Sequence, residues 1–104
     1  MPVGGGEPER FAGLPRERIL GFVVPVAATW PPRLLGLALL ERAEAGEGLL
    51  IPRCRGVHTF GMRFALDLVF LDSEGRVVER RRAVPPRRLA RNRRAWAVLE
   101  LPSR

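Results

Sequence analysis

The residues with the most versatile chemistry are Cys54 and His58, the single cysteine and the single histidine of the chain. They lie four positions apart. A nucleophilic thiolate needs a base within hydrogen-bonding reach, and nearby arginines would lower its pKa. As metal ligands the two are incomplete, because Asp67 could supply a third ligand but nothing obvious supplies a fourth. Three interpretations stay open: a half-buried thiol beside a surface or capping histidine, which is the simplest, a catalytic pair, or a metal site.

Asp67 is the most informative single residue, because it interrupts an apolar run. In residues 64–71 the side chains alternate so that both faces of a strand are mostly apolar, which predicts a central strand. A carboxylate there is costly unless it is paired or hydrogen-bonded. Asp67 therefore either fixes a loop, through backbone N–H groups or an arginine such as Arg63, or is the polar group of a binding cleft.

The segment of residues 59–62 combines a hydroxyl, an aromatic ring, a bare backbone and a thioether. This mixture suits the wall of a pocket, and it suits an ordinary core in which a glycine lets another segment pack closely. Combined with the strand that follows, it predicts a candidate binding cleft. The residues of this cleft are Thr59, Phe60, Met62, Arg63 and Asp67.

Arginine supplies all of the 18 basic residues, and the formal net charge is +7. Residues 1–75 hold 8 arginines against 9 acids, a sum of −1, whereas residues 76–104 hold 10 against 2, a sum of +8. Such a cluster could bind an acidic protein or another polyanion with strong salt dependence. Only Trp96 lies near it and no nucleic-acid-binding motif occurs, so a solvated surface is favoured over nucleic-acid recognition. The basic patch consists of Arg80, Arg81, Arg82, Arg87, Arg88, Arg91, Arg93 and Arg94.

The N-terminal region is expected to be a flexible tail over residues 1–18, because it is rich in glycine and proline. Residues 20–28 predict a strand with an edge or bulge at Pro25. The same segment imitates a signal peptide, but Glu17 and Pro25 argue against secretion. It is also too short to span a membrane as a helix. We therefore expect a cytoplasmic protein, with secretion or membrane tethering as the alternative.

One short amphipathic helix is predicted after Thr29, which would be its N-cap, with Pro31 and Pro32 in the first turn. Leucine and alanine then recur at helical spacing as far as residue 40. The remaining pattern predicts short strands at residues 49–51, 57–60, 64–71, 76–79 and 95–101, with a hairpin turn at 72–75 and a basic loop at 85–94. The predicted fold is mainly β to α+β: one small antiparallel barrel-like domain over residues 19–104 with one short helix.

Three blocks of the sequence resemble the family called domain of unknown function 192. Residues 33–37 are similar to the family's helix, residues 60–62, 66–72 and 75–78 to its core signature, and residues 98–101 to its closing strand. The resemblance implies a compact, mainly β domain with a short helix and brings no established activity with it. Gly61 stands where many members have tryptophan, and Arg63 and Phe64 depart from the pattern after the methionine.

These observations predict a non-enzymatic binding or accessory module whose cleft lies near Thr59, Met62 and Asp67. One alternative is nucleic-acid or polyanion binding through residues 80–94. Another is a thiol-dependent enzyme that uses Cys54 and His58. No cofactor or metal is indicated, because the chain has no phosphate-cradling glycine motif, no nucleophile elbow and no zinc-protease motif.

Overall fold

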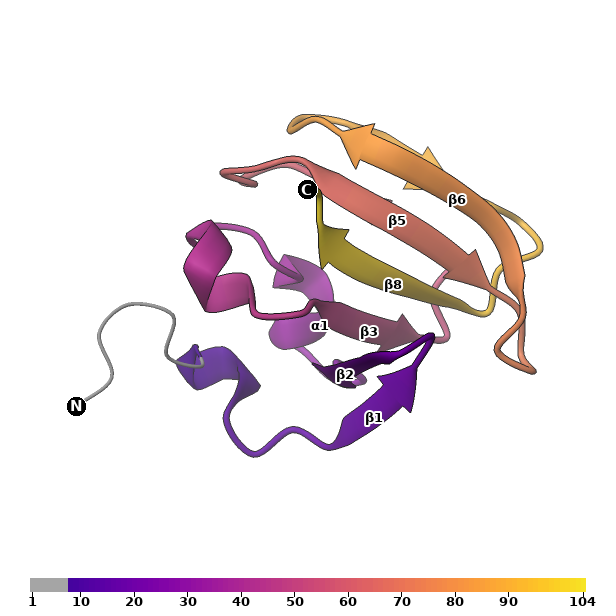
Figure 1. The fold of residues 1–104 in the computed structure, drawn as a ribbon, viewed down its shortest axis with the longest axis horizontal. Helices are drawn as coiled ribbons and strands as arrows, with labels where there is room; N and C mark the ends of the chain where they lie inside the picture. The colour runs from indigo at the N-terminus through magenta and orange to yellow at the C-terminus, as the bar shows by residue number, and fades with distance from the viewer. Residues whose placement is uncertain (1–7) are drawn as a thin grey trace.

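A four-stranded antiparallel sheet of order β3–β8–β5–β6 organises the computed structural model, which describes residues 8–104. Figure 1 shows this sheet strongly twisted, with the β1–β2 hairpin beside β3. The predicted fold class is confirmed: the chain is mostly antiparallel β with one short helix, and the sheets are open rather than closed into a barrel over the described range. The elements are η1 Glu9–Phe11, β1 Arg16–Ile19, β2 Phe22–Pro25, α1 Pro32–Leu35, η2 Arg42–Ala45, β3 Leu49–Pro52, β4 Gly56–His58, β5 Leu66–Leu71, β6 Val77–Val84, β7 Leu89–Arg91 and β8 Ala97–Pro102.

Strand β5 is central, as its alternation predicts, because it pairs with β8 on one side and β6 on the other. Leu68 and Phe70 point into the larger cluster of buried side chains, and Val69 and Leu71 into a smaller cluster on the other face of the sheet. Full burial of such side chains contributes about 1.5–3 kcal/mol each. The larger cluster faces α1 and the β4–β7 pair, so this face of the sheet forms the floor of the site described below.

Strand β6 runs to Val84, several residues beyond its predicted end, and strand β7 lies inside the predicted basic loop of residues 85–94, so part of the basic patch is strand. The turn before it is as expected: the Asp72 carboxylate accepts the backbone N–H groups of Glu74 and Arg76, and Gly75 has a φ of 83°. The extended strand pairs with β5 as far as Val84, and the Arg81 guanidinium lies 5.3 Å from the centre of the Phe70 ring, within reach of a cation–π contact.

The N-terminal region differs from the expected tail from residue 8 onward; residues 1–7 lie outside the described residues. Phe11 is buried in the core at the end of η1, and the neighbouring Arg10 donates to the backbone carbonyls of Gly36 and Ala38. Strands β1 and β2 form a hairpin through Leu20 and Gly21, which have φ values of 51° and 85°. Part of the predicted tail is therefore ordered structure, because an apolar ring and a tight turn hold it against the domain.

The helix is much shorter than its apolar spacing predicts, and its N-cap is Pro31 rather than Thr29. It ends at Gly36, whose φ of 55° leaves the helical region. A β-carbon at that position would lie 2.6 Å from Oε1 of Glu100, so a larger residue would have to displace the end of that side chain as well as adopt a positive φ. With α1 one turn long, no helix among residues 8–104 is long and apolar enough to cross a membrane. The cytoplasmic location stays a prediction.

Candidate ligand-binding site

Glu100 is a carboxyl group buried at the centre of the sheet, with 2% of its surface exposed. On the face that carries the larger core cluster, its neighbours across the sheet are Leu49 on β3 and Leu68 on β5. Burial raises the pKa of the Glu100 carboxyl from the usual value near 4.5 to about 7, although the Leu37 hydrogen bond and the charge of Arg10 oppose the shift. The group therefore changes its charge near neutral pH.

The two oxygens of this carboxyl have different surroundings. Oε1 accepts the backbone N–H of Leu37 at 3.2 Å, just after the turn at Gly36. Oε2 accepts no hydrogen bond from any residue in the range 8–104. Glu100 also lines a cavity, and its carboxyl is held by the turn after α1 at Oε1, while Oε2 has no partner among residues 8–104.

The cavity above Glu100 has a volume of about 390 Å³ and lies between α1, the β4–β7 pair and the floor formed by β3 and β8. This volume is at the small end of the range typical of ligand pockets. Most of its wall is apolar, and among the described residues Glu100 is the single acid in its lining. The apolar wall consists of Leu34, Leu35, Ile51, Val57, Leu89 and Ala90. The polar lining consists of Arg33, Cys54, His58, Arg91 and Glu100.

Cys54 and His58 both line this cavity, so the structure places the predicted reactive pair at one site without joining them by a hydrogen bond. The Cys54 thiol donates to the carbonyl of Gly56 at 3.0 Å. Nδ1 of His58 accepts the backbone N–H of Phe60, which leaves Nε2 to donate to the carbonyl of Leu34 at 3.2 Å. Each side chain therefore already has its own backbone partner.

The charge state of Cys54 also opposes nucleophilic catalysis. Burial raises the pKa of its thiol, with a smaller contribution in the same direction from the charge of Glu100, while the hydrogen bond to Gly56 and the charge of Arg33 oppose it. A thiol nucleophile requires the opposite shift, because the thiolate is the reactive form. The structure therefore gives no support to the thiol-enzyme alternative.

The predicted cleft near Thr59, Met62 and Asp67 does not form. Thr59 is fully buried, and its hydroxyl donates to the carbonyl of Pro85 and accepts the N–H of Arg88. Met62 is part of the core. The physical reason is that residues 59–62 form a tight turn, with the Met62 N–H bonded to the Thr59 carbonyl, and this turn packs inward. Outside the core, Arg63 forms an ion pair with Glu41, and Phe60 is half exposed.

Asp67 lies on the other face of the sheet and holds an irregularity in it. Between the pairs Leu66–Val84 and Leu68–Arg81 the register of β5 and β6 shifts, so that Asp67 faces two residues of β6. Its Oδ1 accepts the backbone N–H of Ala83 at 2.8 Å, which replaces the ladder bond lost at the bulge. Of the two roles open to Asp67, this contact provides the structural one.

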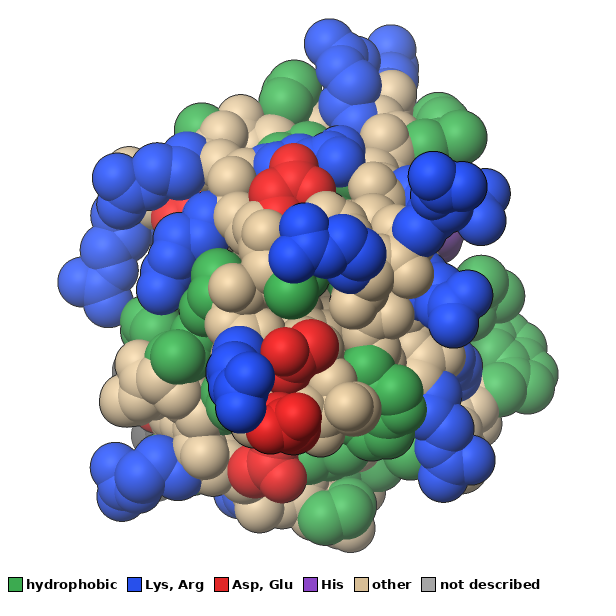
Figure 2. All heavy atoms as spheres, turned by 90° about the vertical axis from the view of Figure 1, so that its right-hand side faces the viewer, with side chains coloured by type: hydrophobic (Ala, Val, Ile, Leu, Met, Phe, Trp, Pro, Cys, Tyr) green, Lys and Arg blue, Asp and Glu red, His purple; other side chains and the backbone are tan. Residues whose placement is uncertain are grey.

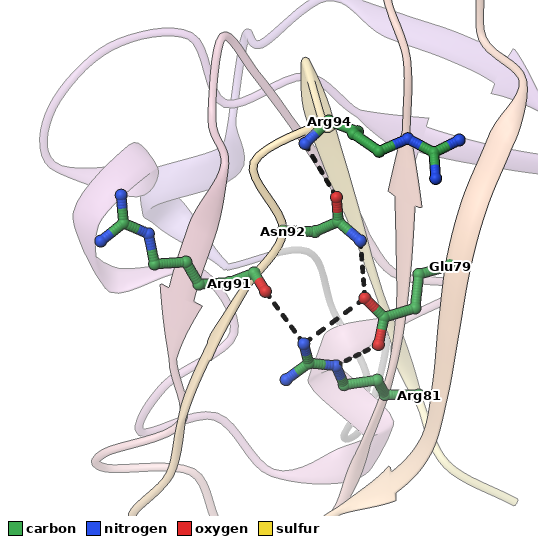
Figure 3. A network of polar contacts seen from close by, with 5 residues as sticks. All are labelled: Glu79, Arg81, Arg91, Asn92 and Arg94. Carbon is green, nitrogen blue, oxygen red and sulfur yellow. Dashed lines mark hydrogen bonds and ion pairs between the residues drawn. The ribbon is translucent and has the colours of Figure 1, made fainter.

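The arginine side chains of the basic patch lie in several different environments. Figure 3 shows one of them: Nε of Arg81 lies 2.6 Å from Oε2 of Glu79, whose Oε1 accepts the Asn92 amide at 2.7 Å. These bonds lower the pKa of Glu79. Arg81 also donates to the backbone carbonyl of Arg91, whose own side chain points away from the network and lines the cavity.

Strand alternation separates Arg80 and Arg82 from Arg81, whereas other arginines of the patch lie outside the strands, at Arg87, Arg88, Arg93 and Arg94. Arg80 and Arg82 face the depression that contains Asp67, on the side opposite the cavity. Figure 2, which looks onto the end of the sheet toward which β5 runs, shows arginines spread over that end with acidic and apolar side chains between them. Residues 80–94 therefore do not form one continuous basic surface.

Glu100 is the functional candidate that sequence reasoning missed. The signal was present, because Glu100 interrupts the apolar strand of residues 97–102 in the same way that Asp67 interrupts residues 64–71. A carboxylate in such a strand demands a partner or an altered charge state. In the part of the chain that the structure describes, no group of three or more His, Cys, Asp or Glu side chains could hold a metal ion.

Comparison with known proteins supplies the family of the chain. The model of DUF192, described as "Uncharacterized ACR", matches residues 15–104, which confirms the predicted resemblance. No curated protein matches. A crystal structure of a protein of unknown function from Novosphingobium aromaticivorans is similar, with a TM-score of 0.62 and 20% identity over 78% of this chain and 64% of that one. At this identity the likeness shows the fold alone, and this chain spans less than two thirds of that protein.

Proposed function

The chain belongs to the uncharacterized family DUF192, and we propose that it is a non-enzymatic module that binds a small organic molecule in the cavity above Glu100. The apolar walls would contact the body of the ligand above the Glu100 carboxyl, and the polar part of the ligand would lie at the mouth of the cavity. Non-enzymatic binding is supported by the surroundings of Cys54, whose raised thiol pKa makes it a weak nucleophile.

One observation carries this proposal: a carboxyl group that is 98% buried has an oxygen without a hydrogen bond from residues 8–104, and it faces a cavity large enough for a ligand. A ligand in this cavity would be stabilised by the burial of its organic body against the apolar walls.

The test is a fragment screen by two-dimensional NMR with two matched variants. Val57→Phe places a larger side chain in the cavity wall, whereas Val77→Phe makes the same change at a partly exposed position on β6 that does not line the cavity. We expect fragments that shift the amide signals of α1, β4 and β7 in the native chain and in Val77→Phe, and no such shifts in Val57→Phe. Fragments that bind Val57→Phe as well as the native chain, or a screen without any binder at this cavity, would refute the proposal.

A second candidate function is polyanion binding on the opposite face, at the depression near Asp67. Four arginines, Arg42, Arg80, Arg82 and Arg104, line it. Its two acids already accept backbone N–H groups, Asp67 from Ala83 and Glu47 from Val23. An anionic chain would therefore meet more positive than negative charge there.

The test compares two double variants that remove the same charge. Arg80→Ala with Arg82→Ala alters the depression, and Arg93→Ala with Arg94→Ala alters the loop before β8. We expect short RNA to bind the native chain at low salt, and only the first pair to weaken it. An equal loss of RNA affinity in both double variants would indicate an effect of net charge and would exclude a binding site at the depression.

A further inference from the structure

The ligand of the Glu100 cavity can be assigned a chemical class, on the premise of the proposed function above. We infer that it is an amphipathic organic anion, whose apolar body fills the cavity and whose negative group lies against Arg91 at the mouth. The inference rests on three features of the site: the charges around the cavity, the absence of an ion pair at Arg91 among the described residues, and the apolar rim.

The charges around the cavity favour an anion. Its lining contains Arg33 and Arg91 against the single buried acid Glu100. In the sequence, no Asp or Glu occurs in residues 18–40, 48–66 or 80–99, and these segments contain α1, β4 and β7. The potential at the mouth is therefore positive, which attracts an anion and repels an amine during the encounter.

Arg91 is the cation available to such a ligand. Both Nη groups of Arg33 donate to backbone carbonyls, those of Pro52 and Arg53, so the Arg33 side chain already has partners. The Arg91 guanidinium makes no ion pair with any other residue of the described range, and its side chain points away from Glu79. An exposed guanidinium beside an apolar cavity is suited to a carboxylate or a phosphate.

The rim of the cavity is apolar, as a ligand with an organic body requires. Leu34 on α1 is 59% exposed and Leu89 on β7 is 77% exposed, and both line the cavity. Trp30, 68% exposed, lies with Leu34 at a second hollow that shares Arg33, Cys54 and Gly56 with the cavity. Large apolar side chains gathered at one exposed place indicate a contact surface.

Glu100 makes the binding of an anion dependent on pH. The other titratable and charged side chains around this carboxyl are Arg10 behind it and Arg33, Cys54, His58 and Arg91 in the cavity lining. A bound apolar body removes water from the carboxyl, and a nearby negative charge opposes its ionisation, so both favour the protonated form. An anion therefore binds together with a proton, and its affinity falls as the pH rises through neutrality.

The test compares octanoate, octanol and octylamine, which share an apolar body and differ in the charge of the head group. Binding to the native chain, followed by NMR titration, is expected to be strongest for octanoate and weakest for octylamine. Arg91→Gln is expected to lower the affinity for octanoate about three- to fivefold, because one partly exposed ion pair is lost. The affinity for octanol is expected to stay the same. Arg93→Gln, which removes the same charge from an exposed position outside the cavity lining, is expected to leave both unchanged.

The pH dependence of octanoate binding is tested by comparing the native chain with Glu100→Gln. Octanoate binding to the native chain should weaken several-fold from about pH 6 to about pH 8, while the variant should show no such change. Octylamine or octanol binding as tightly as octanoate, or equal effects of the two arginine variants, would overturn the assignment of an anion but leave the cavity as a binding site. Failure of all three probes to shift signals at the cavity would instead count against the proposed function itself.

Discussion

Gly36 and Glu100 share one small space: a β-carbon on Gly36 would lie 2.6 Å from Oε1 and 3.2 Å from Oε2 of Glu100. The turn after α1 therefore closes directly over the buried carboxyl, and the next residue, Leu37, donates its N–H to it. The contact links residues that are more than sixty positions apart in the chain. It also explains why the helix stops after one turn, and it places α1 at the edge of the cavity.

Replacing Gly36 with alanine is expected to be far more destabilising than the same change at Gly46. Both glycines end a short helix with nearly equal φ, 55° and 58°, but a β-carbon on Gly46 would meet nothing within 4 Å. Gly46→Ala should cost about 1 kcal/mol, from backbone strain alone. Gly36→Ala should cost about 1–2 kcal/mol more, measured by urea unfolding, because the Glu100 carboxyl must move and loses its hydrogen bond with the Leu37 N–H. Equal costs would show that Glu100 does not occupy the space beside Gly36.

The stability of the chain is expected to fall between about pH 4.5 and pH 7 because of Glu100. Its pKa is raised to about 7 in the folded state, so the folded chain retains a proton that the unfolded chain has already released. The contribution of this group is most favourable below the unfolded pKa and is lost as the pH approaches the folded pKa. Glu100→Gln should therefore be more stable than the native chain by roughly 3 kcal/mol at pH 8 and similar to it at pH 4. Parallel stability curves for the two proteins would contradict this.

Thr59 is expected to be an important structural residue rather than part of a cleft. Thr59→Val keeps the shape but leaves the Pro85 carbonyl and the Arg88 N–H without the hydroxyl. We expect a loss of about 2 kcal/mol in the free energy of unfolding. Thr29→Val is the matched control, since Thr29 is exposed and its hydroxyl makes no hydrogen bond with residues 8–104, and it should change stability by less than about 0.5 kcal/mol.

Cys54 is expected to react slowly with iodoacetamide at neutral pH. Burial raises its thiol pKa, so the thiolate fraction is smaller than in glutathione, and the pH at which the rate reaches half its maximum should be higher. The measurement is the alkylation rate as a function of pH, with glutathione as the reference. A rate at neutral pH that exceeds that of glutathione would revive the thiol-enzyme hypothesis.

The sequence predicts the sheet better than the site, because the alternation of side chains along a strand can be recognised from neighbouring residues alone. The apolar pattern of residues 64–71 places β5 at the centre of the sheet, as observed. The length of the helix depends instead on Glu100, which is remote in the chain. No local pattern can show that a carboxylate from β8 will meet the turn at Gly36.

The site itself is only partly visible in the sequence. Cys54 and His58 are conspicuous and do lie in the cavity, but their hydrogen bonds to Gly56, Leu34 and Phe60 depend on tertiary structure. The arginines appear as one patch in the sequence, yet strand pairing divides them between several environments. Glu100 could have been found by the rule that singled out Asp67, since both are acids within apolar strands.

The most direct measurement is an NMR titration of the side-chain carboxyl carbon of Glu100, carried out without ligand and with saturating octanoate. The structure predicts a midpoint near pH 7 in the free chain, because this carboxyl is buried under the Gly36 turn, and a higher midpoint when the cavity is filled. An ordinary carboxylate midpoint near 4.5 in the free chain, or a midpoint that octanoate does not move, would contradict a buried carboxyl that faces a ligand cavity.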